Sequence, residues 1–428
     1  MSSPARPAQP ESDRPDSGPA DFSLSPREFV AMMAAVLALQ ALAIDAMLPA
    51  LGQIAAELGV SDPNRRQLVV GVFLLGSGIA SLVPGSLADR YGRRPILLVA
   101  MALYIGFALA CAFAPDFDSL LILRILQAAG SAGLMVIPSA IVRDRFSGDR
   151  MARMTSTISM VFMIVPIMAP SVGQAVLLFA GWRWIFNFLA MLGCMVAAWI
   201  YFRLPETLDP ANRQRIDPAV ILRNMRTAAT TRSSIGYVIG SGLVTGSMFG
   251  FINSSQQLIS EHFGAGKAFP LIFAGCAMTM MIANFTNSRI VERFGARRVS
   301  HTAVLLFIAI STLQVFLATR EHETIWQFVP VMAANMCLIG FIGANFSSIA
   351  LQPFAQIAGA AASVQAFVRM VLGSLLGILI GQAFDGTALP LATALLLCGL
   401  LSLALILFSE RGELFRRRNP PGAVLPIP

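Results

Sequence analysis

The chain has 428 residues, of which 56% are hydrophobic and only 13% charged, and its formal net charge is +8 at pH 7. A soluble globular protein carries about 25% charged residues, so this composition excludes a chain of ordinary soluble domains. Apolar runs of about 20 residues, each able to cross a hydrocarbon core of about 30 Å, recur throughout. We therefore predict an all-α integral membrane protein, with no soluble basic domain that could bind nucleic acid.

The chain begins with a polar, proline-rich segment, 1–27, which we expect to be a disordered tail. A cleaved signal peptide is excluded because no apolar region precedes residue 29. Twelve apolar segments follow, six on either side of the polar, arginine-rich linker 204–233, and a second tail covers 409–428. These segments are predicted at 28–50, 67–88, 95–114, 118–142, 153–178, 184–203, 234–258, 268–289, 299–319, 325–349, 357–382 and 388–408.

The basic residues concentrate in the segments that twelve crossings would place on the side of the two termini. Cytoplasmic loops of membrane proteins carry an excess of arginine and lysine. We therefore expect both termini, and the linker between an N-terminal six-helix bundle at 28–203 and a C-terminal one at 234–408, to be cytoplasmic. The expected location is an inner, plasma membrane of bacterial type.

A charged turn recurs at the same place in each half of the chain. The stretch GSLADRYGRRPILL, at 85–98, separates the second and third segments, and NSRIVERFGARRVS, at 287–300, separates the eighth and ninth. Both contain an acid, an arginine, an aromatic residue and a glycine in succession, with two further arginines close behind. This repetition indicates an internal repeat, the construction of many secondary transporters.

The first turn carries a motif by which the chain, over about 28–408, resembles the major facilitator superfamily. Within that superfamily it is similar to the bicyclomycin-resistance (Bcr/CflA) branch of drug:proton antiporters, through IDAMLPALGQIAAELG at 44–59, LRILQAAGSAG at 123–133, IVRDRF at 141–146, WRWIF at 182–186 and LPETL at 204–208. The span-five run APSVG matches only in part, because Ala169 and Gln174 replace expected glycines. The motif residues are Gly85, Asp89, Arg90, Tyr91, Gly92, Arg93 and Arg94.

Three charged residues fall deep within apolar segments. Asp45 in the first and Arg124 in the fourth lie at similar depth, and Arg369 lies near the middle of the eleventh. A charge in hydrocarbon is costly unless it is paired or reaches water. Asp45 is predicted to carry the exchanged proton or attract a cationic substrate, with Arg124 as its partner, and Arg369 to favour an anionic substrate or pair with Asp45. A fixed structural pair, and a snorkelling Arg369, are the alternatives.

Two further sets of residues are predicted to serve movement. The first turn is interpreted as a cytoplasmic gate, in which Asp89 pairs with Arg143 or Arg145 and Asp144 joins the cluster; its alternative is a role in topology alone. Its residues are Gly85, Asp89, Arg90, Gly92, Arg93, Arg94 and Asp144. In the fifth segment Pro166, Pro170 and Gly173 are expected to form a hinge, since each proline removes a backbone donor, although a merely kinked span is the alternative.

The resemblance implies a central cavity lined by the first, seventh and tenth spans, and an apolar cavity with few polar anchors suits lipophilic drugs. Ordinary packing between helices is the alternative for each candidate. The polar candidates for its wall are Gln40, Asn253, Gln256, Gln257, Asn335 and Asn345.

The sequence thus predicts a secondary active transporter with twelve transmembrane helices in two six-helix bundles, the major facilitator fold. It is expected to export small amphipathic drugs by alternating access, as a monomer driven by protons. No nucleotide-binding loop, catalytic set, metal cluster or cofactor site is visible. A proton-coupled importer of a polar metabolite is the first alternative, a membrane-embedded enzyme or a channel a weaker one.

Overall fold

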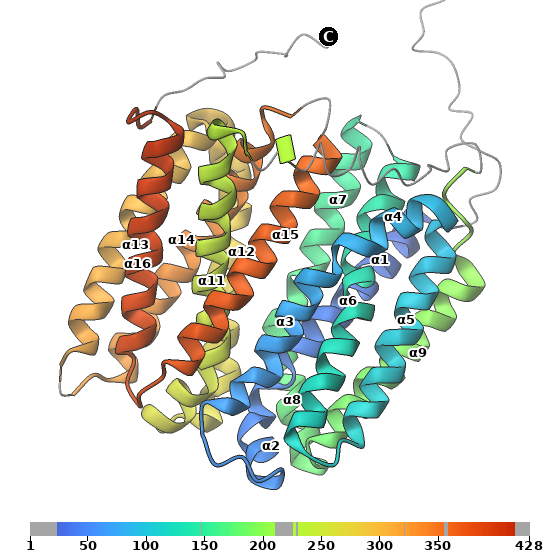
Figure 1. Ribbon diagram of the computed structural model, residues 1–428, viewed down its shortest axis with the longest axis horizontal. Coiled ribbons are helices and arrows are strands. Elements are labelled where there is room, and N and C mark those ends of the chain that lie inside the picture. Colours follow the sequence, from blue (N-terminus) through green and yellow to red (C-terminus); the bar gives the residue numbers. More distant parts are fainter. Residues whose placement is uncertain are drawn as a thin grey trace, which may run out of the picture.

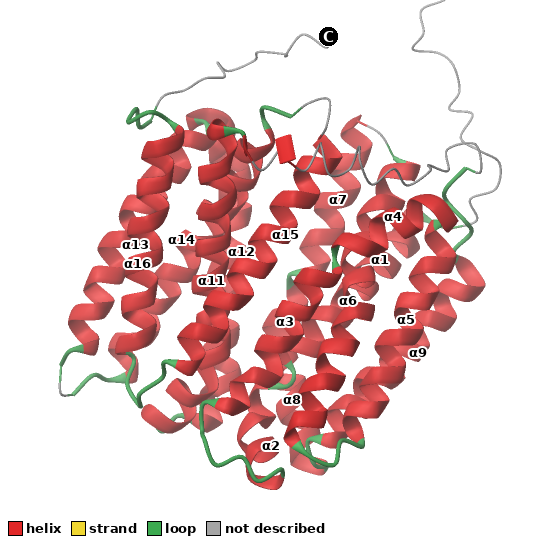
Figure 2. Ribbon diagram, viewed as in Figure 1, coloured by secondary structure: helices red, strands yellow, loops and turns green. Residues whose placement is uncertain are grey.

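The computed structural model describes residues 24–146, 148–209, 226–227, 230–320, 322–354 and 358–415. Most of the two predicted tails, and most of the linker predicted at 204–233, lie outside these residues. Every regular element among the described residues is helical (Figure 2), as an all-α membrane protein requires.

The helices form two groups. The first group consists of α1 (Pro26–Asp45), α2 (Leu51–Glu57), α3 (Leu68–Ala80), α4 (Leu82–Tyr91), α5 (Arg93–Ala112), α6 (Phe117–Arg145), α7 (Gly148–Phe162), α8 (Ile164–Phe179) and α9 (Arg183–Arg203). The second consists of α11 (Arg232–Gln256), α12 (Phe269–Phe294), α13 (Ala296–Ala318), α14 (Ile325–Leu351), α15 (Ala358–Gln382) and α16 (Leu389–Ser409). In the first group α5 packs on α6 and α9, and in the second α11 packs on α14, α15 and α16.

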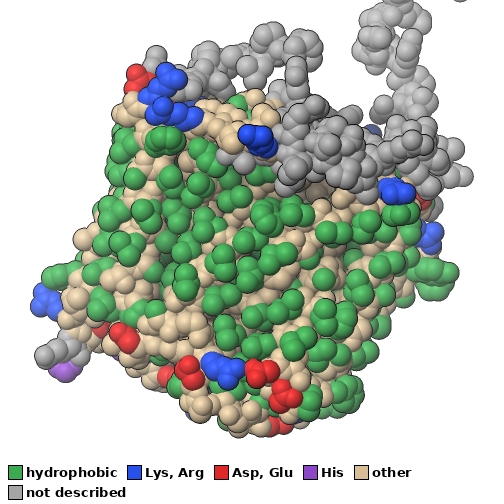
Figure 3. Space-filling model, in the orientation of Figure 1, with side chains coloured by type: hydrophobic (Ala, Val, Ile, Leu, Met, Phe, Trp, Pro, Cys, Tyr) green, Lys and Arg blue, Asp and Glu red, His purple; other side chains and the backbone are tan. Residues whose placement is uncertain are grey.

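Among the described residues, 11 helical stretches are long and apolar enough to cross a membrane. A bent pair of helices makes a twelfth when it is counted as one span. Figure 3 shows the corresponding surface, on which hydrophobic side chains cover the flank and charged ones gather toward the two ends. An apolar belt of this kind faces lipid, because exposing hydrophobic side chains to hydrocarbon is not unfavourable, as it is in water. The twelve predicted segments therefore correspond to helices of the structure.

Two spans are broken, and a proline follows each break by three residues. Span two bends by 43° between α3 and α4, where Pro84 lies in the first turn of α4. Span five is interrupted at Met163, between α7 and α8, and Pro166 lies in the first turn of α8. Because proline has no N–H, it leaves the carbonyl four residues earlier without its helical donor, and the helix restarts there.

Figure 1 shows the two groups side by side, with α3 of the first and α15 of the second meeting between them. A second contact between the groups joins α8 to α12. We call one end of the molecule the Arg93 end: it carries the α4–α5 turn, the start of α1 and the ends of α9 and α16. The opposite end, with the α2–α3 loop, is called the Asn64 end.

The two halves repeat a local structure at the Arg93 end. Gly92 and Gly295 precede α5 and α13 with φ of 109° and 85° and ψ of 152° and 143°, a conformation that disfavours any residue with a side chain. In the first half Glu206, which follows α9, accepts the backbone N–H of Arg93 at 2.9 Å. In the second, Glu410, which follows α16, accepts from the side chain of Arg297 at 2.7 Å. The sequence repeat therefore corresponds to a structural one.

Candidate functional site

A cavity of about 310 Å³ lies between the two groups of helices. Residues of α1, α3, α6, α7 and α8 form one side of its wall, and residues of α11, α12, α14 and α15 form the other. Seven methionines and four phenylalanines dominate the wall, so that its surface is apolar and, through the flexible methionines, adaptable in shape. Among the described residues its charged members are Asp45 and Arg369.

Asp45 enters the cavity from the first group. It is the last residue of α1, and its side chain is largely buried. Its Oδ1 atom is enclosed without a hydrogen-bond partner, and no ion pair joins the carboxyl group to another described residue. The end of a helix that it occupies carries a partial negative charge, which disfavours a carboxylate there. The site therefore favours either a proton on Asp45 or a cationic group beside it.

Arg369 enters the cavity from α15, near the middle of that helix. Within the part of the chain that is described, no hydrogen bond or ion pair involves its guanidinium. Arginines are rarely left unpaired inside membrane proteins, where they usually mark substrate or ion pathways. The second group thus contributes a positive charge to the wall, as the first contributes a carboxyl group.

Gln40, five residues before Asp45 on α1, is the third predicted residue in the cavity wall. Its amide donates to the hydroxyl of Ser77 on α3 at 3.1 Å and approaches the sulfur of Met135 at 3.7 Å. This bond positions a polar group of α1 between α3 and α6. Gln40 therefore both lines the cavity and joins the helices around it.

Arg124 does not lie in the cavity wall, and the predicted pair with Asp45 is wrong. Its guanidinium donates to the backbone carbonyls of Val69 at 3.0 Å and Ala43 at 2.9 Å, and to the side chain of Gln127 at 2.7 Å. It also lies over the ring of Phe73, with 4.1 Å to the ring centre. Similar depth in two antiparallel helices did not place the two charges face to face, because the Arg124 side chain is directed toward α3.

The other predicted lining residues lie elsewhere. Asn335 bonds Ser311 and Gln314 between α13 and α14, and Asn345 bonds Asn287 between α12 and α14. Both amides thus join helices inside the second group. Asn253 and Gln256 are buried on α11, in contact with α15 and with the α1–α2 region respectively.

Gln257 belongs to a cluster that the sequence did not reveal. It begins a π-helical turn, Gln257–His262, that continues α11, and its amide donates to the backbone carbonyl of Pro63 and to the side chain of Asn64, both at 3.1 Å. Asn64 in turn donates to the carbonyls of Gln382 at 3.1 Å and Phe384 at 2.7 Å.

Arg66 extends this cluster by an ion pair of 2.5 Å with Glu261 on the π-helical turn. The hydrogen bonds that join described residues of the two groups gather here, at the Asn64 end. We call these contacts the Asn64 seal. Its polar residues lie near the ends of apolar segments, where sequence alone cannot distinguish them from ordinary loop residues.

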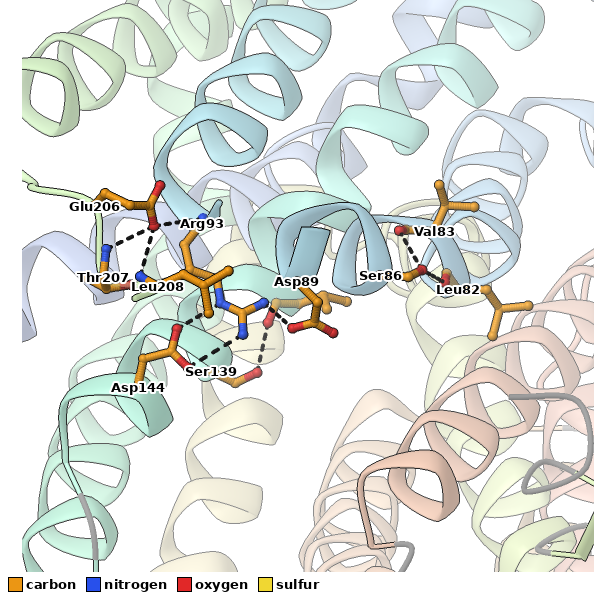
Figure 4. A network of polar contacts seen from close by, with 11 residues as sticks. Leu82, Val83, Ser86, Asp89, Arg93, Ser139, Asp144, Glu206, Thr207 and Leu208 are labelled. Carbon is orange, nitrogen blue, oxygen red and sulfur yellow. Dashed lines mark hydrogen bonds and ion pairs between the residues drawn. The ribbon is translucent and has the colours of Figure 1, made fainter. Parts of the chain in front are cut away.

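The predicted gate residues form a cluster at the Arg93 end (Figure 4). The guanidinium of Arg93 lies between Asp89, at 2.5 Å, and Asp144, at 2.8 Å. Glu206, which the sequence analysis did not single out, accepts the backbone N–H groups of Arg93 and Arg94. The prediction that Asp89 pairs with Arg143 or Arg145 is wrong, because its carboxylate binds Arg93, four residues along the chain at the start of α5.

The partners of Asp89, Arg93 and Asp144 all belong to the first group of helices, so this cluster braces α4, α5 and α6 against one another. Gly92 is confined by the same cluster, since a Cβ there would lie 2.4 Å from the Glu206 carboxylate. The remaining two residues are at its edge: Arg90 is exposed over the ring of Tyr91, and Gly85 faces Val136 of α6.

The three predicted hinge residues have different surroundings. Pro166 lines the cavity at the break between α7 and α8, and Pro170 is buried inside α8. Gly173 provides the closest approach, since a Cβ there would lie 2.0 Å from the backbone carbonyl oxygen of Ala46. Span five therefore combines a break beside the cavity with a tight backbone contact to the end of α1.

Two groups of spans around a central cavity define the fold of a secondary transporter. The chain belongs to the Major Facilitator Superfamily, whose sequence model matches residues 33–378. This confirms the family and the fold that the motif at 85–98 implied.

The relatives agree with the predicted branch. The chain is 28% identical over 360 residues to a bicyclomycin resistance protein homolog of Haemophilus influenzae, covering 84% of this chain and 90% of that protein. It is 30% identical over 372 residues to the multidrug resistance protein MdtL of Escherichia fergusonii, covering 86% and 92%.

Solved structures share the fold at lower identity. The crystal structure of a D-xylose–proton symporter matches with a TM-score of 0.69 at 14% identity, covering 90% of this chain and 98% of the other. A bacterial homolog of the human lysosomal transporter Spinster, in an inward-facing and unoccupied conformation, matches with a TM-score of 0.66 at 16% identity, covering 90% and 95%.

Proposed function

We propose that the protein is a monomeric secondary transporter that exports small amphipathic molecules in exchange for protons and catalyses no chemical reaction. The cavity carries this proposal: it has an apolar, methionine-rich wall with a single carboxyl group whose Oδ1 lacks a hydrogen-bond partner. Such a wall accepts varied apolar bodies, while few polar groups fix their orientation. The relatives named for bicyclomycin and multidrug resistance support the same direction of transport.

The arginine-rich Arg93 end is proposed to face the cytoplasm of a bacterial cell. In this orientation the Asn64 seal would close the outer side, and we propose that the cavity then exchanges with the inner side. Alternating access then requires the seal to open and the groups to rock about their shared contacts, α3 with α15 and α8 with α12.

Asp45 is proposed to couple the two fluxes. A carboxyl group without a partner in an apolar wall is stable either when protonated or when a cationic part of the substrate lies beside it. Proton and substrate therefore compete for the same group. Competition of this kind yields exchange, because the site changes the side to which it is open with either a proton or a substrate molecule bound, but not both.

The test is accumulation of a panel of drugs in everted membrane vesicles, with and without a pH gradient in which the vesicle lumen is acidic. Asp45→Asn keeps the shape of the side chain but cannot release a proton, so gradient-driven accumulation is expected to disappear. Asp118→Asn is the matched control, because this exposed acid lies outside the cavity and pairs with Arg65. Unchanged accumulation by Asp45→Asn would remove the proton-coupling role of this residue.

Import of a polar metabolite is a second candidate, favoured by Arg369 in the wall, which has no partner among the described residues. The two directions are separated in cells that lack the gene: an exporter restores drug resistance when it is supplied again, whereas an importer restores uptake of a metabolite. Gain of uptake without gain of resistance would favour the second candidate.

A further inference from the structure

The charges of the cavity are opposite in sign and come from opposite sides. Asp45 lies on α1 of the first group and Arg369 on α15 of the second. No ion pair joins the two side chains, and no hydrogen bond or ion pair to another described residue neutralises either of them. The rest of the wall offers Gln40 and Thr245 as polar groups among methionine, phenylalanine and aliphatic side chains.

Arg369 differs in this respect from the other arginines that reach the interior of the protein. Arg66 and Arg297 each form an ion pair, with Glu261 and Glu410. Arg93 forms two, and Arg124 is held by two carbonyls and an amide. The fold thus satisfies its structural arginines internally, which leaves Arg369 as the one in the cavity wall without a described partner.

From this pair of charges we infer that the cavity binds small zwitterions with an apolar body, whose cationic group lies at Asp45 and whose anionic group lies at Arg369. The inference deepens the proposed function, on which it rests, by naming the class of substrate. A purely cationic molecule would leave Arg369 as an uncompensated charge in an apolar wall. A purely anionic one would leave a proton on Asp45 and so forgo the attraction between the carboxylate and a cationic group.

A zwitterion is also compatible with exchange for a proton. Its cationic group displaces the proton from Asp45, so substrate and proton remain competitors, while its anionic group adds affinity at Arg369 without taking part in the competition. Because the two charges lie on different helix groups, the zwitterion bridges the groups when it binds. The methionines around it can adjust to bodies of different shape.

The test uses four fluorescent probes built on one aromatic body: norfloxacin, its ethyl ester, N-acetylnorfloxacin and the ethyl ester of N-acetylnorfloxacin. Near neutral pH they are a zwitterion, a cation, an anion and a neutral molecule. Their dissociation constants are measured by fluorescence anisotropy with the full chain in lipid nanodiscs, with empty nanodiscs as the blank and no pH gradient. Norfloxacin is expected to bind about tenfold or more tightly than either singly charged probe, as a charge-assisted hydrogen bond implies.

Each variant should cancel one of these preferences. Arg369→Gln is expected to remove the preference for norfloxacin over its ethyl ester, while Arg369→Lys retains most of it. Asp45→Asn is expected to remove the preference for norfloxacin over N-acetylnorfloxacin. Arg289→Gln is the matched control, since this exposed arginine of the same group lies over Phe285, away from the cavity.

Equal affinity of the wild type for the four probes, or no measurable binding of norfloxacin, overturns the inference, and so do preferences that survive both variants. The wild-type comparison needs no variant to fold, so it stands even if Arg369→Gln is unstable. The outcome is separate from that of the vesicle experiment. Drug accumulation with no preference among the four probes removes only the inference, whereas the expected preferences without gradient-driven accumulation remove only the proposed exchange.

Discussion

At the scale of single residues, Arg124 shows how a buried charge can be held by carbonyl groups and not by an opposite charge. Its guanidinium binds carbonyls of Val69, at the start of α3, and Ala43, near the end of α1. Both belong to helices that line the cavity, and Ala43 lies two residues before Asp45. Arg124 therefore joins α6 to α3 and α1 by hydrogen bonds. Through the bond to Ala43 it helps to position the Asp45 carboxyl group, which it does not contact.

We expect Arg124→Gln to lower the stability of the protein by about 2–5 kcal/mol, because two buried carbonyls lose their donor. Arg90→Gln is the matched control, since Arg90 is exposed and stacks on Tyr91. Thermal unfolding in detergent, followed by fluorescence, should show a lower Tm for the first variant only. Wild-type stability in Arg124→Gln would mean that these bonds contribute little.

Asp45, Arg369 and Gln40 could be predicted as cavity residues from sequence, whereas Asn335 and Asn345 could not be excluded. The difference lies in what apolar segments reveal. A charge within one has few physical solutions, so it marks a site or a pair. An amide has many possible environments, because it can form a hydrogen bond with another amide between two helices, as Asn345 does with Asn287. Which way a polar side chain faces depends on packing that a single sequence does not specify.

At the scale of helices, the prediction was most successful where composition alone decides. The predicted segments 95–114 and 388–408 correspond to α5 and α16 within a few residues. Spans two and five were predicted as continuous segments, although the structure divides each in two. Pro166 did indicate the break in span five, and Pro84 could have indicated the other. The Asn64 seal had no such signal, because its contacts join segments hundreds of residues apart.

Gly173 makes a prediction at this scale, because it sets the distance between α8 and the end of α1. In Gly173→Ala the new Cβ would overlap the carbonyl oxygen of Ala46, so one helix must move, at a cost of about 1–3 kcal/mol. Asp45 adjoins Ala46, and we expect gradient-driven transport to fall by more than the loss of folded protein explains.

Gly106→Ala is the corresponding control, because a Cβ at Gly106 of α5 has open space. Transport per folded molecule, measured in vesicles with the folded fraction determined in parallel, should stay at the wild-type level in that variant. Equal transport per folded molecule by Gly173→Ala and Gly106→Ala would show that transport does not depend on the close approach of α8 to α1.

At the scale of the whole molecule, the polar contacts between described residues of the two groups are concentrated in the Asn64 seal. Asn64 alone takes part in bonds to Gln257, Gln382 and Phe384, and Arg66 adds an ion pair. A typical hydrogen bond contributes about 1 kcal/mol net. We therefore expect the balance between states that are closed and open at the Asn64 end to depend on a few residues.

We expect Asn64→Ala to raise the population of the state that is open at the Asn64 end by about tenfold or more, since at least two hydrogen bonds are lost. Spin labels attached to cysteines that replace Ala56 and His262, two exposed positions at that end, would report the distance between the two groups of helices by double electron–electron resonance. Asp385→Ala, which disturbs only the local turn at Thr387, should leave the distribution unchanged. An unaltered distribution in Asn64→Ala would place the closing energy elsewhere.

The glutamates that follow α9 and α16 have a consequence for biogenesis. Each returns from the last helix of its half to the beginning of the third span of the same half, Glu206 at Arg93 and Glu410 at Arg297. In each half, a glutamate after the last helix thereby binds a residue at the start of the third span, at a backbone N–H in the first half and at a side chain in the second. While the ribosome is still making the second half, the first half already contains both Glu206 and Arg93, so we expect this contact to form in the bilayer before the second half exists.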